Sequence, residues 1–94
     1  MSRIDDRFKS LNGKKALVAF FTAGDPSLSS SKNIFSVIEK GGADIIELGV
    51  PFSDPLADGP VIQASAHRSL QNGTTLRKII ELVKDIRSQS QLPI

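Results

Sequence analysis

Residues 43–60 place the strongest constraint on the fold, because a short apolar run passes directly into a loop that interrupts regular structure. Ile45, Ile46 and Leu48 form a run that is typical of parallel strands buried on both faces. The residues that then end regular structure are Gly49, Pro51, Pro55, Gly59 and Pro60. Ligands bind at the carboxyl ends of strands in α/β proteins, so this loop is the predicted location of a functional site.

Glu47 is the one charged residue within the apolar run, and two interpretations of it remain open. A charge in a buried strand is costly unless it is paired or used in chemistry. In the structural interpretation, Glu47 forms an ion pair with a lysine or arginine of a neighbouring strand. In the functional interpretation, Glu47 is a general acid and base whose pKa is raised by apolar surroundings. Two further acids in the loop, Asp54 and Asp58, favour the functional interpretation.

The remaining sequence predicts helices that alternate with strands. Residues 2–12 carry the spacing of a capping box at Ser2 and Asp5 and predict a short helix, and the mostly apolar residues 16–22 predict a buried strand. The later helices are expected to begin near Ser27, at Pro60 and at Thr74 or Thr75, and to end at Gly41-Gly42, at Asn72-Gly73 and before residues 88–91. Residues 92–94 resemble the beginning of another strand.

The apolar pattern also predicts which side chains are buried. Strand alternation separates a first face with Val18, Phe20, Thr22, Ile45 and Glu47 from a second face with Leu17, Ala19, Phe21, Ile46 and Leu48. Helical periodicity predicts buried faces made by Ile34, Phe35, Val37 and Ile38 and by Leu76, Ile79, Ile80, Val83 and Ile86.

The βαβα order predicts a parallel α/β sheet with right-handed crossovers. Two parallel strands do not make a stable sheet, because parallel sheets have both faces covered and neighbours along their edges. We therefore expect residues 1–94 to be the incomplete N-terminal portion of a single TIM (β/α)8 barrel domain of about 250 residues. This portion contains an N-terminal helix, about two βα units and the start of a third strand, and the first strand face points into the barrel.

Composition excludes several other classes. The 94 residues contain no cysteine, so a disulfide framework, a thiolate nucleophile and a cysteine metal site are excluded. No apolar run reaches the ~20 residues of a membrane helix, and the N-terminus has no signal-peptide core, so the expected location is the cytoplasm. The net charge is +2, and the sequence has no basic cluster that is accompanied by aromatic rings for stacking. Nucleic-acid binding is therefore not predicted.

The favoured site combines Glu47 with Asp58, because two carboxylates that reach one cavity can take separate roles in acid–base chemistry. Asp54 has a second interpretation as a residue that makes a local turn. The three acids could also hold a divalent cation, but no histidine ligand is nearby, and no metal site is predicted. His67 is predicted to be a surface residue, and Gly24 and Gly41-Gly42 are predicted to be turn and helix-stop residues.

Residues 47–60, Glu-Leu-Gly-Val-Pro-Phe-Ser-Asp-Pro-Leu-Ala-Asp-Gly-Pro, resemble the signature of the tryptophan synthase α chain family. Residues 20–26 and Ile62-Gln63 fit the flanking pattern of that family. The resemblance implies a TIM barrel that cleaves indole-3-glycerol phosphate by a retro-aldol reaction to indole and glyceraldehyde 3-phosphate in tryptophan biosynthesis. It also implies an α2β2 heterotetramer in which indole passes to a β chain that binds pyridoxal phosphate.

The resemblance assigns a role to each matching residue. Glu47 corresponds to the acid and base that protonates the indole ring carbon, and Asp58 to the aspartate that accepts the indole N–H. Phe20 and Thr22 correspond to residues that line the substrate pocket. The contact loop for the β chain corresponds to Pro51, Phe52, Asp54 and Pro55. The resemblance implies no metal and no cofactor on this chain.

Residues 1–94 contain none of the late loops that bind phosphate in such barrels, so we do not expect these residues alone to catalyse efficiently. The alternative interpretation is a non-catalytic module that retains only the loop that contacts the β chain.

Overall fold

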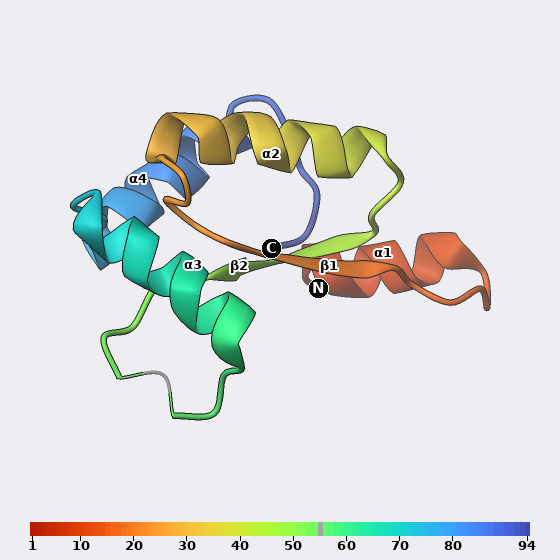
Figure 1. Ribbon diagram of the computed structural model, residues 1–94. Helices are drawn as coiled ribbons and strands as arrows, with labels where there is room; N and C mark the ends of the chain where they lie inside the picture. The colour runs from red at the N-terminus through yellow and green to blue at the C-terminus, as the bar shows by residue number, and fades with distance from the viewer. Residues whose placement is uncertain (55) are drawn as a thin grey trace.

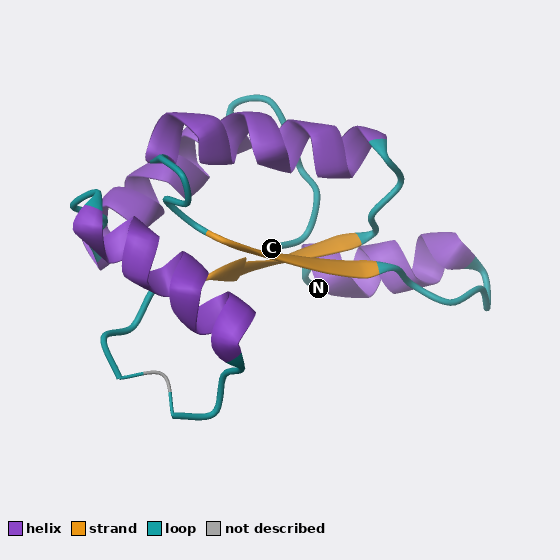
Figure 2. Cartoon of the chain, in the orientation of Figure 1, coloured by secondary structure: helices purple, strands orange, loops and turns teal. Residues whose placement is uncertain are grey.

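The computed structural model describes residues 1–54 and 56–94. The elements follow the order α1 (Arg3–Leu11), β1 (Val18–Thr22), α2 (Leu28–Lys40), β2 (Ile45–Gly49), α3 (Pro60–Gln71) and α4 (Leu76–Arg87) (Figures 1 and 2). The predicted order of helices and strands is confirmed. The first strand is shorter than predicted, because it begins at Val18 rather than at residue 16.

The two strands form a parallel sheet in which Phe20 pairs with Glu47 and Thr22 pairs with Gly49. The final residues lie on the other side of β2, where the backbone N–H of Ile46 donates to the carbonyl of Pro93 at 3.0 Å. Residues 92–94 therefore occupy the position of a third strand next to β2, as the sequence predicts.

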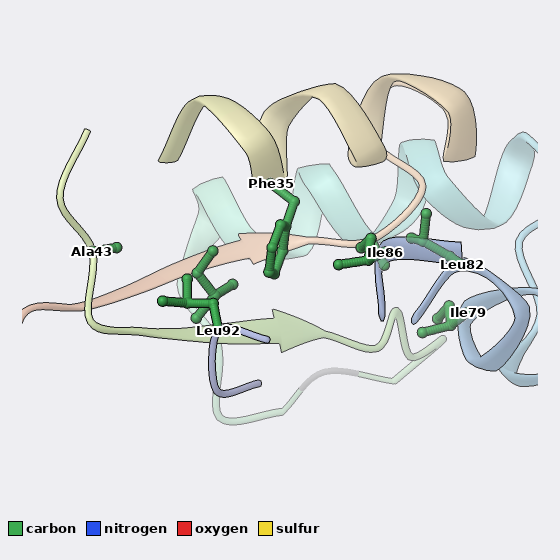
Figure 3. Packing of buried hydrophobic residues seen from close by; sticks show 8 residues of the cluster. Phe35, Ala43, Ile79, Leu82, Ile86 and Leu92 are labelled. Atoms are coloured by element: carbon green, nitrogen blue, oxygen red, sulfur yellow. The ribbon is translucent and has the colours of Figure 1, made fainter. Parts of the chain in front are cut away.

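The hydrophobic core lies between one face of the sheet and helices α2 and α4 (Figure 3). Its buried members are Ala23, Phe35, Ala43, Ile46, Ile79, Leu82, Ile86 and Leu92. Ala19, Phe21 and Leu48 pack against this cluster from the same sheet face. Burial of one large apolar side chain contributes roughly 1.5–3 kcal/mol, so this cluster accounts for the position of both helices.

The opposite sheet face is largely uncovered. Val18 is 46% exposed, Phe20 is 45% exposed, and Glu47 is also exposed, whereas Ile45 and Thr22 are buried. The alternation therefore confirms the two predicted faces within the strands, and the face predicted to point into a barrel carries Glu47.

Several predictions of burial are wrong. Leu17 is exposed because it precedes β1 and does not share the strand's alternation, and Val37 is exposed on the far side of α2. Leu76 and Ile80 are also exposed, because α4 turns Ile79, Leu82 and Ile86 toward the core instead.

The predicted helix caps are confirmed. Ser2 and Asp5 form a reciprocal capping box on α1, and the hydroxyl groups of Ser27 and Thr75 cap α2 and α4. Gly59 is the N-cap of α3, with Pro60 in its first turn. These local signals explain why each helix begins where it does.

Asp44 connects α1 to the amino end of the sheet. Its carboxylate accepts the backbone N–H of Leu17 at 2.7 Å and the guanidinium of Arg7 at 3.0 and 3.1 Å. The hydrogen bond from Leu17 is the largest cause that holds the pKa of Asp44 below its usual value, and Arg7 lowers this pKa further against the opposing effect of burial.

This lowered pKa predicts acid sensitivity. The unfolded chain takes up a proton near the ordinary aspartate pKa of about 3.9, whereas folded Asp44 takes it up only at lower pH. The stabilisation is therefore complete above about pH 5 and is lost as the pH falls through the unfolded and then the folded pKa.

In a complete barrel that carries residues 1–94, we expect Asp44→Asn to lower the urea midpoint at pH 7 and to flatten the decline of this midpoint below about pH 5. Arg7→Gln should flatten this decline less, because the hydrogen bond from Leu17, which is the largest cause of the lowered Asp44 pKa, remains. Equal flattening in the two variants would contradict this assignment.

Candidate active site

The turn that follows β1, residues 23–27 (the β1 turn), is held from both sides by hydrogen bonds. From α3, the Ser69 hydroxyl donates to the carbonyl of Ala23 at 2.6 Å, and Asn72 donates to the carbonyl of Pro26. From α2, the Ser31 hydroxyl oxygen accepts the Gly24 N–H at 2.8 Å. The carboxyl end of β1 is therefore fixed against both helices.

A two-bond ion pair strengthens the contact with α3. The Arg68 guanidinium donates to both carboxylate oxygens of Asp25 at 2.9 Å. The hydrogen bonds from Arg68 hold the pKa of Asp25 below its usual value, and Asp25 raises the pKa of Arg68 in return. Bidentate geometry of this kind fixes orientation as well as distance.

Gly24 allows the β1 turn to approach the loop between α3 and α4. Its φ is +84°, and a Cβ atom at this position would overlap Thr74 Oγ1 and lie 2.5 Å from Ser69 Oγ. Thr74 Oγ1 is also the buried side-chain polar atom that lacks a hydrogen-bond partner within the described part of the chain. A turn with a positive φ and no room for a side chain requires glycine at this position. This confirms Gly24 as a turn residue.

A cleft of about 190 Å³ opens at the carboxyl ends of both strands. It is lined by Phe20, Thr22, Gly49, Val50, Pro51, Phe52, Asp58, Ile62 and Ala66. Three of the four predicted catalytic and substrate-binding residues, Phe20, Thr22 and Asp58, therefore line one cleft. The remaining lining residues are glycine or apolar in type, which suits an aromatic ligand.

Asp58 reaches the cleft from the loop between β2 and α3, which extends away from the helices in Figure 1. The Gln63 side-chain amide donates to the backbone carbonyl of Asp58 at 2.6 Å. Because Gln63 belongs to the first turn of α3, this bond links the position of Asp58 to the helix that also contacts the β1 turn.

Glu47 lies beside this cleft without lining it. Its register partner is Phe20, and paired residues of neighbouring strands point to the same sheet face. The predicted apolar surroundings are wrong in part, because the sequence neighbours Ile46 and Leu48 lie on the opposite face, whereas the apolar residues Phe20 and Ile45 share the face of Glu47. The ion pairs among residues 1–54 and 56–94 join Arg7 to Asp44, Lys32 to Asp85 and Arg68 to Asp25, so the structural interpretation gains no support from them.

The predicted partner-contact residues that the structure describes lie in the loop after β2, where Pro51 and Phe52 also line the cleft. Phe52 is 64% exposed, Asp54 is exposed, and Pro51 is half-buried at the edge of the cleft. The backbone N–H of Leu56 donates to the carbonyl of Asp54 at 2.9 Å, so Asp54 takes part in a turn through its backbone. Pro55 lies outside the described residues.

Other candidate chemistry finds little support in the described residues. His67 is exposed on α3, as predicted. Nowhere in residues 1–54 and 56–94 do three histidine, cysteine or acidic side chains come together in an arrangement that could hold a metal ion. Every helix in these same residues is too short or too polar to cross a bilayer.

The sequence did not predict that Gly49 and the α3 residues Ile62 and Ala66 line a cleft. Ile62 and Ala66 are four residues apart and face the cleft together, which a helical wheel of α3 would have indicated. Gly49 leaves room for the ring of Phe20, because a Cβ atom there would lie 2.6 Å from its Cζ atom. This steric relation depends on strand pairing, which local sequence does not encode.

The fold and the position of the cleft together indicate a class of protein. A parallel βαβα segment with acidic and apolar residues at its carboxyl edge fits the N-terminal part of a TIM barrel. The chain superimposes on tryptophan synthase subunit alpha from Legionella pneumophila with a TM-score of 0.94 and 38% identity, covering 99% of this chain and 36% of that chain.

The family model described as tryptophan synthase alpha chain matches residues 8–94, and the chain belongs to this family. It is 58% identical to the tryptophan synthase alpha chain of Citrifermentans bemidjiense, over 100% of this chain and 36% of the relative. It also resembles a chain in the tryptophan synthase α2β2 complex of Pyrococcus furiosus, with a TM-score of 0.80, 46% identity and coverage of 84% of this chain and 33% of that chain. The chain thus spans about a third of the length of these relatives.

The close approach at Gly24 makes a testable prediction in a barrel that carries residues 1–94 of this sequence and the remaining segment of the Citrifermentans bemidjiense relative (the completed barrel). We expect Gly24→Ala to lower the free energy of unfolding in urea by about 2–4 kcal/mol, through both backbone strain and overlap.

Gly13→Ala is the matched control, because Gly13 has a φ of +86° and open space around its Cβ position. Gly13→Ala should lower the free energy of unfolding only through backbone strain, by about 1–2 kcal/mol. Equal losses in the two variants would contradict the proposed contact with α3 and Thr74.

Proposed function

We propose that residues 1–94 form the first part of the single barrel domain of a tryptophan synthase α chain, a lyase that cleaves indole-3-glycerol phosphate to indole and glyceraldehyde 3-phosphate. The observation that carries this proposal is the cleft lined by Phe20, Thr22 and Asp58, with Glu47 beside Phe20 on the same sheet face. Membership of the family supports the proposed reaction. The lining of the cleft supports the proposed roles of the individual residues.

The proposed reaction begins with proton transfer from Glu47 to the indole ring carbon that bears the glycerol phosphate chain. Protonation makes the ring an electron-accepting indoleninium ion. Asp58 accepts the ring N–H and stabilises the positive charge, which is greatest in this intermediate. The two carboxyl groups thus carry different protonation states at the same step, as acid–base catalysis requires.

Carbon–carbon cleavage then returns the bonding electrons to the ring. The chain hydroxyl next to the ring loses its proton as its carbon becomes the aldehyde of glyceraldehyde 3-phosphate. Glu47 lost its own proton in the first step, and its carboxylate now accepts the proton of this hydroxyl. The new ring C–H bond remains, so the product is neutral indole and Glu47 is protonated again.

The cleft walls supply the binding surface for the ring. Phe20 remains 45% exposed and lies over Gly49, so one face of its ring is available to an aromatic ligand. Offset stacking of two rings contributes roughly 0.5–1.5 kcal/mol beyond the burial of area. The phosphate group would bind to barrel loops beyond residue 94, as in other barrels of this class.

The proposed partner is a tryptophan synthase β chain in an α2β2 tetramer, contacted through the loop with Pro51, Phe52, Asp54 and Pro55. The 64% exposure of the Phe52 ring supports this role, because exposed aromatic residues are enriched in interfaces. Pyridoxal phosphate is proposed for the β chain alone, and Glu47 and Asp58 need no metal or cofactor for the steps above. The proposed location is the cytoplasm, without membrane or nucleic-acid partners.

The test compares two charge-neutral substitutions in the completed barrel. Glu47→Gln should lower kcat by about 100- to 10,000-fold and leave the urea midpoint unchanged, because the amide has no acidic proton to give to the ring carbon. Glu81→Gln, an exposed carboxylate on α4, is the matched control and should retain parental kcat. Turnover by Glu47→Gln within tenfold of the parent would overturn the proposed role of Glu47.

A further inference from the structure

A chain of hydrogen bonds connects the cleft wall to α3. Thr22 Oγ1 and Ser65 Oγ are 2.7 Å apart, and the Ser65 hydroxyl donates to the carbonyl of Ile62 at 2.8 Å. Thr22 is 7% exposed and Ser65 is 8% exposed, so water does not replace these partners. Thr22 also lines the cleft, which makes it the end of the chain that faces a ligand.

The number of hydroxyl protons determines which group donates and which accepts in this chain of hydrogen bonds. Each hydroxyl group carries one proton and two acceptor lone pairs. The Ser65 proton lies on the carbonyl of Ile62, which cannot donate, so Ser65 can only accept from Thr22. The Thr22 proton therefore points at Ser65, away from the cleft. Bonds of this kind polarise one another, which strengthens the Thr22 oxygen as an acceptor.

We infer that Ser65 is a positioning residue that fixes the Thr22 hydroxyl as a hydrogen-bond acceptor, so the cleft selects a ligand that places a donor against Thr22. This inference rests on the proposed function and deepens it. Asp58 takes the ring N–H in that function, so the donor at Thr22 is a hydroxyl of the substrate's glycerol chain. A carbonyl or other acceptor-only group at the same place would face the Thr22 lone pairs and be rejected.

Ser69 provides a matched control on the same helix. It lies four residues after Ser65, is fully buried, and donates to the carbonyl of Ala23 at 2.6 Å. Its removal deletes a buried hydroxyl and a contact with the end of β1, but leaves the bond between Thr22 and Ser65 intact. Any general loosening of α3 should therefore be visible in both variants, whereas a change in donor selectivity should be visible only at Ser65.

The experiment compares two inhibitors of the completed barrel that differ at one position of the chain. One is 3-(indol-3-yl)propyl phosphate, and the other carries a ketone at the chain carbon attached to the ring. The measured quantity is the ratio of their inhibition constants within each variant, so general losses of affinity cancel. The parent should bind the ketone no more tightly than the propyl compound.

Ser65→Ala frees the Thr22 proton to point into the cleft. We expect this variant to bind the ketone about 5–10-fold more tightly than the propyl compound, the effect of one neutral hydrogen bond. Ser69→Ala should keep the parental ratio. Thr22→Val/Ser65→Ala should also return to the parental ratio, because the hydroxyl that Ser65 directs is then absent.

A parental ratio in Ser65→Ala would overturn the inference, as would the same change of ratio in Ser69→Ala. Thr22→Val alone gives a second route, because it should remove any advantage of the hydroxylated substrate over the propyl compound in binding; a retained advantage would also overturn the inference. A completed barrel that neither cleaves indole-3-glycerol phosphate nor binds either inhibitor would overturn the proposed function and this inference together.

Discussion

The hydrogen bonds between α3 and the carboxyl end of β1 are the interaction on which the candidate site depends. Ser65, Ser69, Arg68 and Asn72 contact Thr22, Ala23, Asp25 and Pro26, respectively. These four residues lie on the last two turns of α3 and at its C-cap, so one helix fixes most of this segment. Because the same helix begins beside Asp58, these bonds place one wall of the cleft relative to the other.

The parallel register places core residues on one face of the two strands and candidate catalytic residues on the other face. Ile46, Phe21 and Leu48 face the helices and pack with the core, whereas Phe20 and Glu47 lie side by side on the uncovered face. The loop after β2 adds Asp58 at the same edge. An aromatic ring and two carboxylates therefore lie toward the carboxyl ends of the strands, and neither carboxylate belongs to the hydrophobic core.

Periodicity and caps predicted the order of the elements well, because these signals are local. The capping box at Ser2 and the proline at the start of α3 are each encoded within a few residues. Burial was predicted less well, since both Val37 and Leu82 are apolar and only tertiary packing decides that Leu82 faces the core. Glu47 and Asp58 were found because acids are unusual in such a stretch, and the family resemblance then gave them roles.

Ser65 could not be found in the same way. Serine within a helix commonly faces solvent or bonds to its own backbone, and its sequence neighbours give no sign of a partner. Its importance comes from Thr22, 43 positions away in the chain. Residues that act through such distant contacts become visible only when the strand ends and the helix are placed together.

The most direct test of the account is a crystal structure of the completed barrel with 3-(indol-3-yl)propyl phosphate bound. The account predicts the indole ring against Phe20, its N–H about 2.7–3.2 Å from the Asp58 carboxylate, and the Glu47 carboxyl group about 3–3.5 Å from the ring carbon that bears the chain. A ring bound outside the cleft, or one that contacts Asp58 while Glu47 lies beyond reach of that carbon, would contradict it.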